Sequence, residues 1–372
     1  MTDPLLQRAW RRRWERVLAR LRLDQGVGTL EYVGMITLAA VLAVTVATTP
    51  LATALGGKAR WAVCVVVDGG PCTSPDVPRT PYEQAVAGGY VALGDSFSSG
   101  EGAGDYTSDS DHDPNSGWDR VGKWFDDHLI PGGHSHLEPT NFCHRSGNAY
   151  GPIIAGQNHF GGGSTFAACS GATTADFEHP NGANAGEQPQ LDEITRDTTL
   201  VTFSIGGNDM HFADVLADCI WDGSTCEEKN EADFEKNLRD LRPKLVAMYR
   251  EAQNRAADGA RVIVVGYPRL FPDDPSTSYR DLLFADDQRW MNEKADQLNA
   301  MLASAAQEAG VEFVDPTNAF RGHGIGSDDP WFNDLTLGGP GWAPVNPGSF
   351  HPNAAGQAAL AALVQQQLEH PR

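Results

Sequence analysis

Short apolar runs alternate with longer amphipathic segments from about Gly89 to the C-terminus. The runs have the length and the β-branched or aromatic content of strands. They are Tyr90–Leu93, Ser164–Ala167, Leu200–Ser204, Arg261–Val265 and Val311–Val314. Helical patterns cover Glu231–Ala257, Asp286–Ala309 and Ala354–Glu369. The second helical pattern repeats its apolar residues every three or four positions, and Asp286 or Asp287 can cap its start. This alternation predicts an α/β fold, a three-layer α/β/α sandwich around a five-stranded parallel sheet.

Small or polar residues follow three of the predicted strands. They are Asp95-Ser96, Ser170-Gly171 and Gly207-Asn208. The carboxyl ends of parallel strands meet at one edge of a sheet, and open α/β sheets bind their ligands there. We therefore expect these three pairs to lie close together and to form a functional site.

The N-terminal region follows a different pattern. Leu30–Leu55 carries a single charge, on Glu31, and about 20 apolar residues are enough to span a bilayer as a helix. Residues 1–25 contain seven arginines and three acidic residues, which places this end in the cytoplasm by the positive-inside rule. The pattern predicts a basic cytoplasmic segment at 1–29, a transmembrane helix at 30–55, a Pro- and Gly-rich linker at 56–88 and an extracellular domain at 89–372. The chain would then be a single-pass protein of the cell membrane.

Two alternatives to a permanent anchor remain open. A cleaved secretory signal would release the domain, although the basic region is long and no clear cleavage site follows. Gly26–Tyr32 also resembles the entry motif of Flp-type (type IVb) pilins, in which a peptidase cuts after the glycine. In those proteins the glutamate, here Glu31, helps to register the assembling helix. That resemblance implies a mature chain that begins at Val27.

The charge of the chain narrows the range of partners. The 372 residues carry a formal net charge of −21. Residues 1–25 contribute +4, so the remainder carries −25. Binding to nucleic acid needs clustered Lys and Arg, so this acidic body excludes nucleic acid as an expected partner. We expect a monomer.

The six cysteines suit an oxidising compartment outside the cytoplasm. Sequential pairing would join Cys64 to Cys72, Cys143 to Cys169 and Cys219 to Cys226. This is one of fifteen possible connectivities, so it is a hypothesis. A zinc site is the alternative use of cysteine, but the C-x2-C spacing typical of such sites is absent from the sequence.

The residues at the strand ends are of the types that nucleophilic catalysis needs. A serine hydroxyl is a weak nucleophile at neutral pH, so it requires a base within hydrogen-bond reach and donors for the developing oxyanion. Ser96 follows the first strand directly, in a turn rich in glycine. Asn208 offers an amide side chain and Gly171 an accessible backbone N–H. His351 opens the last helical segment, which is a rigid mount for a general base.

Four blocks occur in one order along the chain: Gly94-Asp95-Ser96, Gly171, Gly206-Gly207-Asn208-Asp209 and His351-Pro352-Asn353. In this order they resemble the SGNH (GDSL-like) hydrolases, over about Tyr90 to Leu368. Cys143–Ser146, Ala168–Ala172 and Gly322–Ile325 are similar to a secreted actinobacterial branch of esterases and lipases.

The resemblance implies a flavodoxin-like sandwich and a serine ester hydrolase. It implies Ser96 as the nucleophile and His351 as its base. The oxyanion hole would consist of the N–H groups of Ser96 and Gly171 and the side chain of Asn208. The reaction would proceed through an acyl-enzyme and would use no cofactor and no metal.

The chain departs from the commoner family pattern at Gly348. Many relatives carry an Asp three residues before the histidine, where it orients the imidazole. The branch resembled here uses a backbone carbonyl instead, so we expect the carbonyl of Gly348 to orient His351. A carboxylate from elsewhere is the alternative, and the candidates are Asp315, Asp328, Asp329 and Asp334. A second departure is Ser327, where some relatives have a cysteine.

The sequence leaves the substrate open between lipid esters and acylated polysaccharides, because loops 97–142 and 267–285 shape the groove. Its aromatic residues Trp118, Trp124, Phe125 and Trp331 would line either a substrate groove or the core. The rival hypothesis is a pilus-associated or surface ligand-binding protein built on the hydrolase fold.

Two further features are weaker indications, both of a metal site. Asp109, Asp111 and Asp113 alternate as in a calcium loop, but Pro114 replaces its glycine, and His134 and His136 are interpreted as surface residues.

Overall fold

The computed structural model describes residues 79–115, 137–221, 225–275, 278–280, 282–338 and 345–370. Thr80–Arg372 forms one compact unit. Among the described helices, none combines the length and the hydropathy needed to cross a membrane. The predicted membrane helix Leu30–Leu55, the pilin-like segment and the Cys64–Cys72 pair lie outside the described residues, as do His134, His136, Trp118, Trp124 and Phe125.

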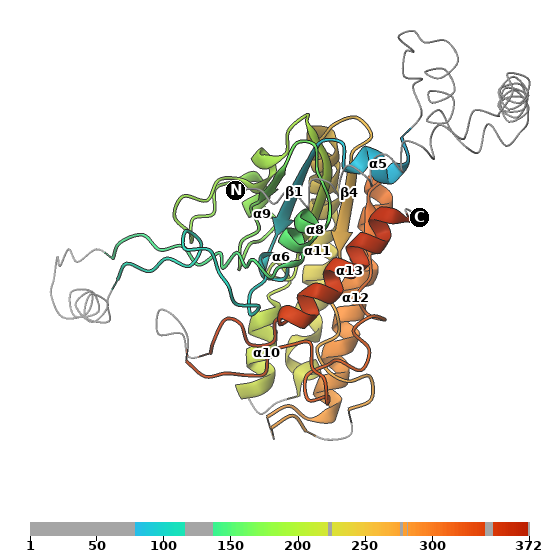
Figure 1. Cartoon of the computed structure of the whole chain (residues 1–372). Coiled ribbons are helices and arrows are strands. Elements are labelled where there is room, and N and C mark those ends of the chain that lie inside the picture. The colour runs from blue at the N-terminus through green and yellow to red at the C-terminus, as the bar shows by residue number, and fades with distance from the viewer. Residues whose placement is uncertain are drawn as a thin grey trace, which may run out of the picture. The chain divides into compact units, whose positions relative to one another are not determined.

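The centre of this unit is a five-stranded, wholly parallel sheet (Figure 1). Its strands are β1 (Gly89–Gly94), β2 (Ser164–Phe166), β3 (Thr198–Ser204), β4 (Arg261–Val265) and β5 (Glu312–Val314). Their spatial order is β2-β1-β3-β4-β5. The five-stranded parallel sheet predicted from the sequence is therefore confirmed, with strand ends that differ by one or two residues.

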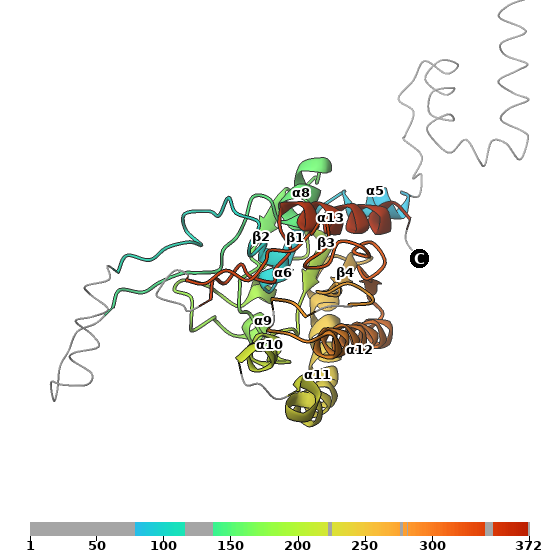
Figure 2. The same cartoon turned by 90° about the horizontal axis from the view of Figure 1, so that it is seen from below.

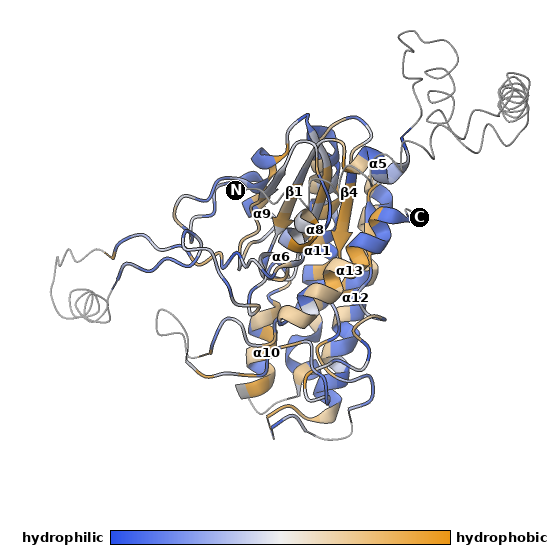
Figure 3. Ribbon diagram, in the orientation of Figure 1, coloured by the Kyte–Doolittle hydropathy of each residue, from blue (hydrophilic) through white to orange (hydrophobic). Residues whose placement is uncertain are grey.

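Helices cover both faces of the sheet (Figure 2). One layer contains α5 (Pro81–Ala85), α8 (Tyr150–Gln157) and α13 (Ala354–Glu369), and the other contains α9 (Ala175–Glu178), α10 (Phe212–Trp221), α11 (Cys226–Arg255) and α12 (Ala285–Ala309). Successive strand residues point to opposite faces. Tyr90 and Ala92 pack into the core beneath α8 and α13, whereas Val91 and Leu93 pack into the core beneath α11 and α12. Both faces are apolar, and β4 is strongly hydrophobic in Figure 3.

The sequence pattern missed α5, α8 and α10 and placed the start of α11 too late. Helix α8 contains Gly151, Pro152 and Gly156, which lower helix propensity. A Cβ atom on Gly151 would lie 2.8 Å from that of Ala92, so glycine is what lets this helix pack closely on β1. In α11 the side chain of Thr225 caps the first turn, and that turn is polar, so apolar periodicity could not reveal it.

Two disulfides of the proposed pairing are formed, Cys143–Cys169 and Cys219–Cys226. The first joins the loop that precedes α8 to the segment after β2. The second joins the end of α10 to the start of α11. Cys169 lies close after the end of β2, so the first bridge ties a loop to the edge of the sheet where the strands end.

Candidate active site

Ser96 occupies a tight turn at the end of β1. The turn begins at Gly94, whose φ of 122° is in a region that side chains rarely adopt. A Cβ there would also lie 2.5 Å from the carbonyl oxygen of Ser204. Asp95 then caps the short helix α6 (Ser96–Ser99), because its Oδ1 accepts a hydrogen bond of 3.0 Å from the N–H of Phe97. The turn therefore presents Ser96, 7% exposed, as the first residue of a helix.

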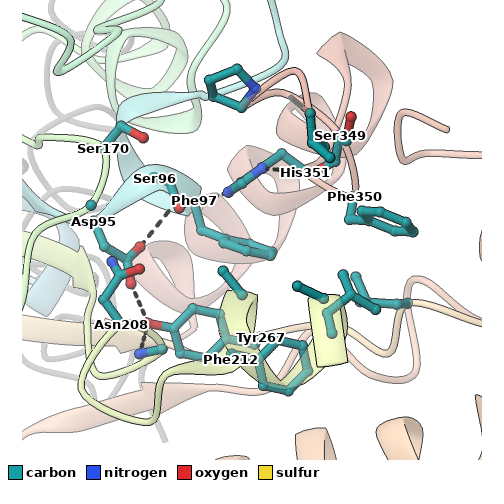
Figure 4. A pocket seen from close by; sticks show the side chains of 18 of the residues that line it. Asp95, Ser96, Phe97, Ser170, Asn208, Phe212, Tyr267, Ser349, Phe350 and His351 are labelled. Carbon is teal, nitrogen blue, oxygen red and sulfur yellow. Dashed lines mark hydrogen bonds between the residues drawn. The ribbon is translucent and has the colours of Figure 1, made fainter. Parts of the chain in front are cut away.

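His351 contacts Ser96 directly. Its Nε2 lies 2.7 Å from the Oγ of Ser96, although 255 positions separate the two residues in the sequence (Figure 4). The histidine precedes α13, which Asn353 caps through the N–H groups of Ala355 and Gly356. Burial lowers the pKa of His351 below its ordinary value, and the negative charge of Glu101 offsets only part of this effect. The imidazole is therefore neutral at neutral pH, as a general base must be.

The carbonyl beside His351 is that of Ser349, which corrects the prediction of Gly348. The Nδ1 of His351 lies 3.1 Å from the oxygen of Ser349. The Gly348 carbonyl points elsewhere: it accepts a hydrogen bond of 3.1 Å from the side chain of Asn333 and one of 3.3 Å from the backbone N–H of His351. The chain turns between Gly348 and His351. The carbonyl of Gly348 therefore accepts from the backbone N–H of His351, whereas the carbonyl of Ser349 faces the imidazole ring. With Nδ1–H donating to Ser349, Nε2 is the nitrogen that accepts the hydroxyl proton of Ser96.

Three of the four alternative carboxylates are engaged in other contacts. Asp315 accepts a hydrogen bond from the N–H of Thr317. Asp334 accepts one from Arg280, and Asp329 lies 3.2 Å from the Nδ1 of His323. The side chain of His351 makes hydrogen bonds with Ser96 and with the carbonyl of Ser349, and the backbone of Pro347 also contributes a hydrogen bond that favours the charged ring. The geometry is that of a Ser–His pair with a backbone carbonyl behind the imidazole.

The other two strand ends meet at Ser96, as expected. Gly171 and Asn208 line the same cavity as Ser96 and His351. Gly171 has a φ of 81°, and a Cβ on it would meet nothing within 4 Å, so its backbone borders open space. The side chain of Asn208 donates one hydrogen bond, of 2.8 Å, to the carbonyl of Ala172. An amide nitrogen carries two hydrogens, so a second donor remains on this side chain.

The cavity beside Ser96 is mostly apolar. It has a volume of about 390 Å³. Its polar end contains Ser96, Gly171, Asn208 and His351, and its apolar walls come from α10, from the loop after β4 and from the segment before α13. The apolar lining includes Phe97, Phe212, Leu216, Ile220, Leu270, Leu335 and Phe350. A polar reaction site therefore opens into a space that can hold a hydrocarbon chain.

A buried ionic pair, Glu101 and His144, lies behind the turn that carries Ser96. The sequence pattern did not predict it. Glu101, 1% exposed, lies 2.6 Å from the Nδ1 of His144. Burial opposes the charged form of Glu101, but the hydrogen bond with His144, together with the attraction to His351 when that ring is protonated, outweighs it and lowers the pKa of Glu101. The same contact raises the pKa of His144 despite burial. Only the fold brings these residues together, so no local pattern could have revealed the pair.

The alternating aspartates form ion pairs with neighbouring basic residues. Asp109 lies 3.2 Å from Arg145, and Asp111 lies 3.5 Å from the Nε2 of His144. Asp113 accepts a hydrogen bond from the N–H of Asn115. In the part of the chain that the structure describes, no three His, Cys, Asp or Glu side chains gather as a metal site would require.

Comparisons with known proteins agree with this geometry. The sequence model of the GDSL-like Lipase/Acylhydrolase family matches residues 92–359. A lipase of Streptomyces rimosus is 32% identical over 269 residues, which are 72% of this chain and 82% of that lipase. Lipase 1 of Streptomyces coelicolor is 31% identical over 278 residues, 74% of this chain and 85% of its own length.

Two solved structures are similar over the same region. The crystal structure of the extracellular lipase of Streptomyces rimosus has a TM-score of 0.59 and 31% identity, and the match covers 75% of this chain and 99% of that one. The structure of phospholipase A1 from Streptomyces albidoflavus NA297 has a TM-score of 0.55 and 31% identity, with the same coverage of 75% and 99%.

Proposed function

This chain belongs to the GDSL-like lipase/acylhydrolase family and is a carboxylic ester hydrolase; we propose that it cleaves esters of apolar acyl chains through an acyl-enzyme formed on Ser96. The observation that carries the proposal is the hydrogen bond of 2.7 Å between Ser96 Oγ and His351 Nε2 at the polar end of an apolar cavity.

The reaction begins when His351 takes the hydroxyl proton of Ser96 while Oγ attacks the carbonyl carbon of the ester. The N–H groups of Ser96 and Gly171 and the side chain of Asn208 stabilise the oxyanion, because fixed donors need no reorganisation as the charge develops. The intermediate collapses, and the leaving alcohol takes its proton from the imidazolium. Water, deprotonated by the same imidazole, then attacks the acyl-enzyme. The bond between the acyl carbon and Oγ breaks, the imidazolium returns the proton to Ser96 Oγ, and the acid is released. The carbonyl of Ser349, 3.1 Å from Nδ1, holds the ring in the required tautomer.

The lining of the cavity favours lipid esters over acylated polysaccharides. Side chains such as Phe212, Leu216 and Ile220 would exclude water from an acyl chain, whereas they offer no hydrogen bonds to a sugar. Each CH₂ group transferred from water into such a space contributes about 0.8 kcal/mol. The lipases and the phospholipase A1 to which the chain is similar agree with this substrate class.

We further propose that the enzyme acts outside the cytoplasm. Two formed disulfides suit an oxidising compartment, and the similar lipase of Streptomyces rimosus is described as extracellular. The predicted helix Leu30–Leu55 would hold the enzyme at the membrane, with secretion after processing as the alternative. A pilus-associated binding protein without turnover, the rival hypothesis, does not fit a family of ester hydrolases.

A panel of p-nitrophenyl esters from acetate to decanoate tests the acyl preference. We expect kcat/KM to rise with chain length and turnover to vanish in Ser96→Ala and in His351→Ala, because the pair acts as a unit. Leu216→Trp should lower kcat/KM for octanoate about tenfold and spare acetate, since it fills the cavity away from Ser96.

The matched control is Asp214→Trp, an exposed residue of the same helix that is absent from the cavity lining. It should leave the chain-length profile unchanged. Turnover that survives in Ser96→Ala would overturn the mechanism. A preference for acetate, or higher turnover on acetylated xylan than on any lipid ester, would overturn the substrate class.

A further inference from the structure

A buried tyrosine, Tyr267, joins the nucleophile turn to the strand end that carries Asn208. Its hydroxyl donates a short hydrogen bond to Asp95 Oδ2 and accepts one of 3.0 Å from the N–H of Gly207 (Figure 4). Asp95 is the residue before Ser96, and Gly207 is the residue before Asn208. One hydroxyl group therefore bridges the main chain next to the nucleophile and the main chain next to the proposed oxyanion donor.

When Asp95 is ionised, the donors and acceptors of this bridge can be arranged in only one way. A backbone N–H can only donate, so Gly207 uses the oxygen of Tyr267 as its acceptor. The hydroxyl has a single proton, which then points at Asp95. The other oxygen of Asp95 accepts the N–H of Phe97 at 3.0 Å and caps the helix that begins at Ser96. Each hydrogen bond between Gly207 and the start of α6 therefore has a defined donor and a defined acceptor.

Tyr267 itself has little freedom to move. Its N–H donates to Asn299 Oδ1 at 2.9 Å, and its carbonyl accepts from Asn299 Nδ2 at 2.7 Å, which anchors it to α12. Its ring packs edge-on against Phe97, with centroids 5.0 Å apart. A Cβ on Gly207 would lie 3.3 Å from the ring, so ring and main chain are in close contact. Tyr267 is only 6% exposed.

The carboxyl group of Asp95 depends on this tyrosine. Asp95 is 1% exposed, and burial raises its pKa to about 7, while the hydrogen bond from Tyr267 lowers it. The negative charge of Asp209 raises it further. A buried carboxylate oxygen without a donor is unfavourable. Loss of the hydroxyl would remove the Tyr267 partner of Asp95 Oδ2 and of the Gly207 N–H, and would leave Asp95 with its backbone donors alone.

We propose that Tyr267 is a positioning residue, which holds Ser96 and Asn208 at the spacing that the transition state requires. It acts through Asp95 on one side and Gly207 on the other, and its hydroxyl transfers no proton to the substrate. This inference rests on the proposed function, in which Asn208 donates to the oxyanion.

The test is Tyr267→Phe, which removes the hydroxyl and keeps the ring and its packing. We expect kcat to fall about 10- to 100-fold, because small displacements of reacting groups carry penalties of this order. KM should stay within about two-fold, since the apolar lining is unchanged. In an Asn208→Ala background, Tyr267→Phe should lower kcat by less than about three-fold. The tyrosine acts by holding the Asn208 amide in place, so its loss matters little once that amide is gone.

Tyr249→Phe is the matched control. Tyr249 is fully buried in the same core, and its hydroxyl has no hydrogen-bond partner among the described residues. It should leave kcat unchanged. Asp95→Asn, which keeps the shape of the side chain but opposes the tyrosine with an N–H₂ group, should lower kcat as Tyr267→Phe does. Thermal unfolding of each variant is measured alongside.

Three results would overturn the inference. They are a kcat of Tyr267→Phe within about two-fold of wild type, an equal loss with and without Asn208, and failure of both Tyr267→Phe and Asp95→Asn to fold. In the last case the network would support the fold rather than the site. Turnover that survives in Ser96→Ala overturns the proposed function instead, so the two failures are distinguishable.

Discussion

His351 is a buried histidine that faces a hydroxyl, a carbonyl and, at longer range, the charge of Glu101. Burial disfavours the imidazolium, so its pKa lies below the ordinary value of 6.5, and Glu101 acts in the opposite direction. The Ser349 carbonyl orients the ring but contributes less charge stabilisation than a carboxylate would. Glu101 is the carboxylate whose negative charge favours the protonated form of His351, so it would stabilise the imidazolium of the proposed mechanism.

The pH dependence of turnover follows from these shifts. The neutral imidazole is the active form, so kcat/KM should rise with pH through the pKa of His351, with a midpoint below 6.5. Glu101→Gln removes a charge that favours the protonated ring, so the midpoint should move to lower pH. The control is Glu187→Gln, whose carboxylate pairs with Arg145 at 2.9 Å, and it should not shift the profile. A shift of the Glu101→Gln midpoint to higher pH would contradict this account.

A Ser–His pair and a hidden triad differ in their response to the loss of a carboxylate. We expect Asn substitutions of Asp315, Asp328, Asp329 and Asp334 to have modest effects, because the structure places a carbonyl behind His351. Loss of a true triad Asp can lower the rate by about 10⁴. Asn208→Ala should lower kcat by about 10²–10³. A collapse of about 10⁴ in any folded Asp→Asn variant would show that a carboxylate is essential.

At the level of secondary structure, α10 forms one wall of the apolar cavity beside Ser96. Phe212, Leu216 and Ile220 recur at helical spacing and all line the cavity. The helix is only ten residues long, and the Cys219–Cys226 disulfide ties its end to the start of α11. A bridge that closes so short a loop stabilises the fold by about 2 kcal/mol.

Removing this bridge should affect long substrates most. In the Cys219→Ser/Cys226→Ser double variant we expect kcat/KM for octanoate to fall several-fold more than kcat/KM for acetate, because acetate does not reach the wall. Steady-state kinetics on the two esters, with unfolding followed by circular dichroism, measures both effects. An equal fall on acetate and octanoate would show that the bridge supports the fold as a whole and has no particular role at the wall.

At the scale of the whole molecule, the compact unit begins at Thr80 and contains every residue of the candidate site. Residues Pro81–Ala85, which the sequence pattern assigned to the linker, form the helix α5 of this unit. The helix packs against α13 and the sheet, so a chain shortened beyond this point would lose part of that layer.

A chain of residues 80–372 should therefore fold and retain full turnover, whereas the longer chain should fractionate with membranes through Leu30–Leu55. Fractionation and N-terminal sequencing of the mature protein check this prediction. A mature N-terminus at Val27 would indicate pilin-like processing. Recovery of the full-length chain from the cytosol would contradict the predicted topology.

The sequence alone determined the local features of this protein. Strands and amphipathic helices follow from the spacing of apolar residues, and the glycines beside Ser96 and Asn208 mark turns wherever the chain folds. These signals lie within a few residues of one another, so the five-stranded parallel sheet was predicted correctly.

Contacts between residues that are far apart in the sequence depend on the tertiary structure. Tyr267 and Asp95 are separated by 172 positions, and Glu101 and His144 by 43, so no periodicity connects them. The carbonyl behind His351 is that of Ser349 rather than Gly348 because the turn before α13 rotates one peptide away from the ring and the next one toward it. Helix α8 forms despite its Gly and Pro because β1 provides a surface on which it packs. Which residues pair, how each side chain is oriented and what shape the cavity has all depend on which helices and strands pack together.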